Sequence, residues 1–89
     1  MIRRRVVVHG DVQGVGFRWN ARAEAERLGV TGWVRNRPDA TVEAEVQGTV
    51  DAVQRMLDWL SHGPRHARVD SIEVSEVPAE GSGPFEVRG

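Results

Sequence analysis

The 89-residue sequence contains no cysteine, no lysine and no tyrosine. The absence of cysteine excludes a disulfide framework, a thiolate metal site and a cysteine nucleophile. Without lysine, no side-chain amine is available to form a Schiff base. All twelve basic side chains are therefore arginine, whose planar guanidinium stays charged and can bind two oxygens of one anion at once.

Long apolar runs are also missing, and no stretch reaches the roughly 20 residues that a membrane-spanning helix needs. The sequence shows no signal-peptide pattern, so with no disulfides we expect a cytoplasmic protein without a membrane partner. A chain of this length buries one modest core. We therefore expect residues 1–89 to form a single domain, with a monomer as the default state.

The charge is balanced overall but unevenly distributed. The net charge is −1, which gives no indication of a nucleic-acid partner. Residues 1–40 carry eight arginines against four acidic side chains, whereas residues 41–89 carry four arginines against nine acidic ones. An anionic ligand would be favoured in the N-terminal part of the chain.

A glycine-rich stretch in that part joins an expected strand to an expected helix. Val6–His9 is a β-branched run typical of a central strand, and small side chains at helical spacing predict a helix over residues 19–28. Between them, residues 10–18 follow the order G-x-x-x-G-x-G and end in Arg18. Flexible glycines, a helix N-terminus and a guanidinium together predict a site for a compact oxyanion, with phosphate the first candidate.

Spacing alone leaves a purely structural turn open. The glycine order differs from G-x-G-x-x-G, and the stretch lacks the Lys-Ser/Thr ending of a nucleoside-triphosphate loop. Arg18 at a helix start could simply pair with a carboxylate. We expect the neighbouring Trp19 to be partly buried against the loop rather than to stack on a ligand.

The remaining pattern completes an α+β domain. Residues 30–37 and 41–48 predict a hairpin around the turn at 38–40, and the alternation in the second strand places Glu43 and Glu45 on a solvated face. An amphipathic helix follows from Thr49 to about Gly63, then strands at 67–77 and 85–88. The order β-α-β-β-α-β predicts a ferredoxin-like sandwich, with a mainly antiparallel sheet and both helices on one face.

Two motifs resemble those of the acylphosphatase family. The first is Val12-Gln13-Gly14-Val15-Gly16-Phe17-Arg18, and the second is Gly32-Trp33-Val34-Arg35-Asn36 with Pro38-Asp39 after it. The resemblance extends over essentially the whole chain. Ala40 departs from it, because the family usually has glycine at this point of the hairpin turn. Arg37 is larger and more charged than we would expect there and could alter substrate access.

The resemblance implies an enzyme and a division of roles within its site. It implies hydrolysis of a small-molecule acyl phosphate to a carboxylate and inorganic phosphate, without a metal, a cofactor or a covalent phosphoenzyme. Arg18 would hold the phosphate together with the backbone N–H groups of five loop residues, Gln13, Gly14, Val15, Gly16 and Phe17. Asn36 would orient the attacking water through its amide, although an Asn at a strand end could equally serve only the turn. The acyl group stays open.

Two alternatives of other classes remain. A non-catalytic module that binds a small anion could use the same fold and loop. An RNA-recognition motif shares the element order but needs aromatic side chains on its two central strands. The strands expected in that position, Arg3–His9 and Thr41–Gly48, carry no aromatic residue, so we expect no nucleic acid to bind.

Overall fold

The computed structural model describes residues 1–81 and 83–89. Its elements are β1 (Ile2–Asp11), α1 (Phe17–Leu28), β2 (Thr31–Asn36), β3 (Val42–Gly48), α2 (Val50–His62), β4 (Arg68–Val77) and β5 (Glu86–Arg88). The expected order and type of every element are confirmed. The boundaries shift by a few residues, chiefly in β1, which is longer because it pairs with a strand on each side.

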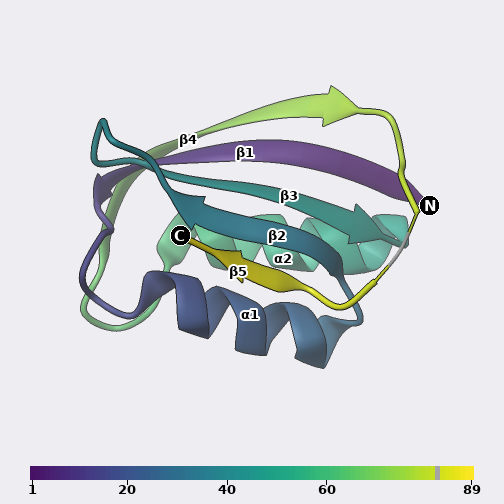
Figure 1. Cartoon of the computed structure of the whole chain (residues 1–89), viewed down its shortest axis with the longest axis horizontal. Helices are drawn as coiled ribbons and strands as arrows, with labels where there is room; N and C mark the ends of the chain where they lie inside the picture. The colour runs from purple at the N-terminus through teal and green to yellow at the C-terminus, as the bar shows by residue number, and fades with distance from the viewer. Residues whose placement is uncertain (82) are drawn as a thin grey trace.

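The strands form one five-stranded sheet in the order β4-β1-β3-β2-β5. The pairs β1–β3, β1–β4 and β2–β3 are antiparallel, and only the short β5 runs parallel to its neighbour β2. Both helices cover the same face of the sheet (Figure 1). The predicted ferredoxin-like sandwich is therefore confirmed, with β3 at the centre of the sheet between β1 and β2.

The core lies between the sheet and the two helices. It is built from small and medium apolar side chains: Val6, Val8, Val12, Phe17, Ala21, Ala25, Val30, Val34, Val42, Ala44, Val46, Val53, Met56, Leu60 and Phe85. In α1 the alanines at i and i+4 let the helix backbone approach the sheet closely. The helix begins at Phe17 because Gly16, with φ of 76°, turns the chain into it.

The opposite face of the sheet is polar but less exposed than the alternation suggested. The expectation of a fully solvated Glu43 is wrong, because this residue is only 4% exposed. Its carboxylate accepts hydrogen bonds of 2.6 Å from both Arg5 Nε and Arg35 Nε. Long guanidinium side chains from the neighbouring strands thus cover the carboxylate while they neutralise it.

The helices of the described residues are short and amphipathic. None of them is long and apolar enough to cross a membrane.

Candidate active site

The loop after β1 enters α1 through two glycines in the left-handed region. Gly14 has φ of 77° and Gly16 φ of 76°, and neither value suits a side chain with a Cβ. Gly16 serves as the N-cap of α1 without a side-chain hydrogen bond, and the first turn contains no acidic residue. The first N–H groups of the helix therefore have no partner within it, and no carboxylate of that turn competes for them.

A cavity of about 220 Å³ opens at this helix end. It is lined by Val12, Gly14, Gly16, Phe17, Arg18, Trp19 and Asn36. The structure thus brings together Arg18 and Asn36, the two side chains singled out in the sequence. Figure 1 shows why: the loop after β1 and the β2–β3 turn lie at the same end of the molecule. Among the described residues that line the cavity, Arg18 alone carries a charge, so the cavity favours an anion.

Arg18 is held by backbone rather than by a carboxylate. Its Nη1 donates a 2.8 Å hydrogen bond to the carbonyl oxygen of Arg88 in β5. Within residues 1–81 and 83–89 it forms no ion pair. The alternative that Arg18 simply pairs with a carboxylate is therefore not what the structure shows. A guanidinium has five N–H donors, and one such bond leaves enough of them to bind two oxygens of an anion.

Asn36 is the last residue of β2 and pairs with Val42 at the start of β3. Its side chain is half-buried and lines the cavity. In the part of the chain that the structure describes, its amide has no hydrogen-bond partner, so it does not serve the turn. An amide that is fixed by a strand and left unpaired can hold a water or a substrate oxygen.

Gln13 makes a side-chain contact in addition to the backbone role predicted for it. Its side-chain Nε2 donates two hydrogen bonds of 2.8 Å, to the carbonyl oxygens of Arg37 and Thr41. Gln13 does not line the cavity; its side chain instead connects the loop to the hairpin that carries Asn36. This contact could not be predicted from local sequence patterns, because its partners are 24 and 28 residues away.

Val15 and Phe17 both contribute their side chains to the core, although Phe17 also lines the cavity. Val15 packs against the core cluster, and Phe17 is 2% exposed with its ring 5.4 Å from that of Trp59, edge to face. A Cβ at Gly63 would lie 2.8 Å from the Phe17 ring, which explains the glycine there. Val15 does not line the cavity, so any contact of Val15 with a ligand there is limited to its backbone N–H.

The hairpin turn keeps its form without glycine. Ala40 adopts φ of 74°, and its N–H donates to the carbonyl oxygen of Arg37 at 3.2 Å. Hydrogen bonds from the Thr41 hydroxyl and N–H lower the pKa of Asp39 below its usual value. Asp39 in turn pairs with the Arg37 guanidinium at 3.2 Å. Arg37 is thereby paired in the turn and does not line the cavity.

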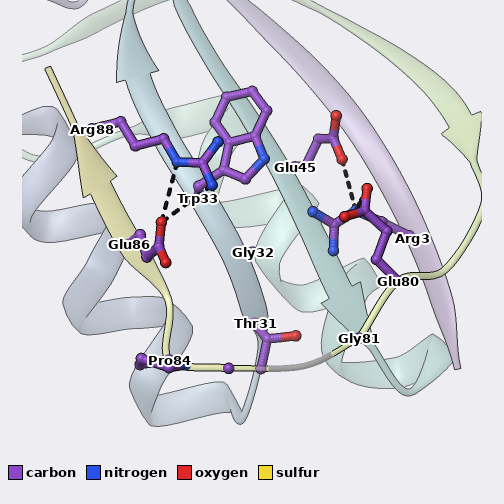
Figure 2. Close-up of a pocket in the computed structure, with 11 residues that line it drawn as sticks. Arg3, Thr31, Gly32, Trp33, Glu45, Glu80, Gly81, Pro84, Glu86 and Arg88 are labelled. Carbon is purple, nitrogen blue, oxygen red and sulfur yellow. Dashed lines mark hydrogen bonds and ion pairs between the residues drawn. The ribbon is translucent and has the colours of Figure 1, made fainter.

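A second cavity, of about 380 Å³, lies on the open face of the sheet beside β2 and β5 (Figure 2). Its charged side chains are already matched to one another. Arg3 pairs with Glu45 at 2.7 Å and with Glu80 at 3.7 Å, whereas Arg88 pairs with Glu86 at 3.1 Å and lies over the Trp33 ring. This cavity is larger than the one at Arg18, but both guanidinium groups among its described residues are paired with carboxylates, so it offers no free cation to an anionic ligand.

Comparison with known proteins agrees with the geometry. The family model for acylphosphatase matches residues 4–87. An acylphosphatase of Rubrobacter xylanophilus is 55% identical over 97% of this chain and 79% of its own length. An acylphosphatase of Anaeromyxobacter dehalogenans is 54% identical over 98% and 95%.

Solved structures show the same likeness. The crystal structure of acylphosphatase from Bacillus subtilis superimposes with a TM-score of 0.96 at 36% sequence identity, and the match covers 100% of both chains. Sequence motifs, fold and relatives all agree over nearly the full length: this chain belongs to the acylphosphatase family.

Proposed function

We propose that this protein hydrolyses acyl phosphates to a carboxylate and inorganic phosphate in the cavity at the N-terminus of α1, without a metal. The observation that carries the proposal is that Arg18 in α1 and Asn36 at the end of β2 line one cavity together with Gly14 and Gly16. A lone guanidinium at a helix N-terminus suits a phosphoryl group. Membership of the acylphosphatase family supports the same reaction.

The chemistry of the leaving group fits the side chains present. The conjugate acid of a carboxylate leaving group has a pKa of roughly 4, comparable to an Asp or Glu side chain. Such a group departs without receiving a proton from the enzyme. A site made of Arg18, Asn36 and backbone N–H groups therefore suffices for an acyl phosphate. A phosphate monoester releases a far more basic alkoxide, which requires a general acid or a metal.

In the proposed reaction, the oxygen of a water molecule attacks phosphorus while the bond from phosphorus to the acyl oxygen breaks. Arg18 and the loop N–H groups hold the phosphoryl oxygens and stabilise the charge that develops on them. The Asn36 amide orients the water for in-line attack. The proton of the water passes to a phosphoryl oxygen, so the products are a carboxylate and a protonated phosphate.

Phosphate release from benzoyl phosphate tests the proposal, measured with a metal chelator present and with phenyl phosphate as the matched monoester. The leaving groups differ from a carboxylate to a phenol, whose pKa is about 10. We expect metal-independent release from benzoyl phosphate, none from phenyl phosphate, and loss of release in Arg18→Ala.

Other outcomes would favour other functions. A folded wild-type protein that releases no phosphate, yet binds inorganic phosphate through Arg18, would be the small-anion module. Release from phenyl phosphate at a comparable rate would contradict the leaving-group argument. Release that stops when the chelator is added would contradict metal independence.

A further inference from the structure

Trp19 is more exposed than the sequence suggested. The expectation that it packs partly against the loop is wrong, because 60% of the residue is accessible to solvent. It follows Arg18 directly in the first turn of α1 and lines the same cavity as Arg18 and Asn36. An exposed indole at the edge of a cavity is a different case from an apolar side chain scattered on the surface.

The other two tryptophans have structural partners that account for them. Trp59 packs edge to face on Phe17. Trp33 lies on the open face of the sheet, with the guanidinium of Arg88 4.9 Å from its ring centre. Trp19 fills no core position, and most of its large flat surface remains exposed.

The Trp19 ring is nevertheless held in place. The guanidinium of Arg22, one helical turn later, lies over the ring at 6.0 Å from its centre. Arg22 is itself tied to Glu26 at 3.5 Å. These contacts of Trp19, Arg22 and Glu26 along α1 restrict the rotation of the indole. Less conformational entropy is then lost when a ligand contacts it than for a freely rotating side chain.

We propose that Trp19 is a platform for the acyl group of the substrate, and that the site therefore favours acyl phosphates with an aromatic or extended apolar acyl group over acetyl phosphate. This inference rests on the proposed function. With the phosphoryl group at Arg18 and the loop, the acyl group must project from the cavity of about 220 Å³ past its rim. Trp19 lies on that rim and offers a flat apolar surface, on which a planar acyl group gains most.

Paired kinetics test the platform. We would measure kcat/KM for benzoyl phosphate and for acetyl phosphate in the wild type, Trp19→Ala and Trp19→Phe. Because each substrate keeps its intrinsic reactivity, the change in the ratio of the two values reports the contact alone. We expect the benzoyl-to-acetyl ratio to fall about 2- to 10-fold in Trp19→Ala, mainly through KM, and to be largely kept in Trp19→Phe.

Two controls separate the platform from a general disturbance of the site. Inhibition by inorganic phosphate should be unchanged in Trp19→Ala, because phosphate does not reach the indole. Trp33→Phe, on the opposite face of the sheet, should leave the ratio at its wild-type value. A ratio that does not move in Trp19→Ala, or an equal loss for both substrates, would overturn the platform while leaving the hydrolysis intact. Hydrolysis of neither substrate by the wild type would refute the proposed function and the platform with it.

Discussion

Arg18 and Asn36 would contribute different physical effects to the proposed reaction. Arg18 supplies a fixed charge, and its contact with the Arg88 carbonyl sets the orientation of the guanidinium. Asn36 supplies a neutral amide that no residue of the described chain engages. A charged group holds the phosphoryl oxygens of the substrate and would also stabilise the charge that develops on them, whereas an amide that orients water contributes mainly to turnover.

This difference predicts a separation of binding from turnover in Asn36→Ala. We expect kcat on benzoyl phosphate to fall about 100-fold or more, as for other preorganised donors. Inhibition by inorganic phosphate should stay near its wild-type value, because Arg18 and the loop are untouched. Gln54→Ala, which removes an exposed amide on α2, is the matched control. Full activity of a folded Asn36→Ala would refute the assigned role.

Ala40 is strained in the hairpin turn. Its φ of 74° costs an alanine about 1–2 kcal/mol. Glycine removes this strain but adds about 0.4–1 kcal/mol of unfolded-state entropy. We therefore expect Ala40→Gly to raise the free energy of unfolding by up to about 1 kcal/mol, measured by urea denaturation. A clear loss of stability would show that the alanine Cβ makes a compensating contact.

At the scale of elements, the site joins two segments that the chain does not connect directly. The loop before α1 carries the anion-binding groups, and the β2–β3 hairpin carries Asn36. The side chain of Gln13 links them by hydrogen bonds to the carbonyl oxygens of Arg37 and Thr41. Each of these oxygens also accepts a backbone N–H, from Ala40 and Arg37 respectively, so neither would be left without a partner if Gln13 were replaced.

Gln13→Met should therefore disturb the relative position of loop and hairpin more than the stability of either. Methionine is unbranched and adaptable but cannot donate. We expect kcat to fall about 10- to 100-fold, since small misplacements are costly in catalysis. The free energy of unfolding should fall by only about 1–2 kcal/mol.

A double-mutant cycle separates positioning from mere stabilisation. If Gln13 acts through the hairpin on Asn36, Gln13→Met should cost far less turnover in an Asn36→Ala background than in the wild type. Equal costs in both backgrounds would mean that Gln13 contributes only to the fold.

The elements could be predicted because their signals are local, whereas Arg18 and Asn36 were singled out as a pair by the resemblance to the two family motifs. Val42, Ala44 and Val46 alternate cleanly, and α2 has a regular apolar stripe with Thr49 as its N-cap. Gly14 and Gly16 lie where positive φ is needed. These features depend on neighbours within a few residues, so the sequence contains them.

The remaining features depend on contacts between distant segments. The hydrogen bond from Arg18 to the Arg88 carbonyl joins residues 70 positions apart. The side-chain hydrogen bonds of Gln13 connect the loop before α1 to the β2–β3 hairpin. Glu43 was expected in solvent because alternation tells which face a side chain is on, not what covers that face. Trp19 was expected to be partly buried because it is large and apolar. The sequence does not reveal that its position in α1 lies at the edge of a cavity, where it stays exposed.

For the molecule as a whole, one face of the sheet packs on the helices and the other carries a charge network. Glu43 lies at its centre between Arg5 and Arg35. Burial raises its pKa, but the hydrogen bonds and charges of the two arginines outweigh burial, so the pKa lies below the usual value. A carboxylate whose pKa is lowered by folding stabilises the protein above its unfolded pKa, and this contribution is lost as the pH falls through the folded value.

This network predicts a specific acid dependence. At pH 7, Glu43→Gln should lower the free energy of unfolding by about 1–2 kcal/mol, because the neutral amide offers no charged acceptor to Arg5 and Arg35. The difference between wild type and variant should persist down to about pH 4.3 and shrink below it, as Glu43 becomes protonated in the wild type. Urea denaturation across this range measures it. Glu76 is exposed and pairs with Arg4. Glu76→Gln should therefore differ little from the wild type in free energy of unfolding at any pH. A Glu43→Gln difference that grows in acid would contradict the sign.

The proposed place of hydrolysis is the cavity at the N-terminus of α1. The most direct test is turnover of benzoyl phosphate by Arg18→Lys beside Arg27→Lys, a matched change in the same helix at a residue paired with Glu24. We predict that Arg18→Lys loses about 100-fold or more, because an ammonium cannot reproduce the guanidinium fork, whereas Arg27→Lys keeps wild-type turnover. Near-wild-type turnover by a folded Arg18→Lys would contradict the assignment of the site.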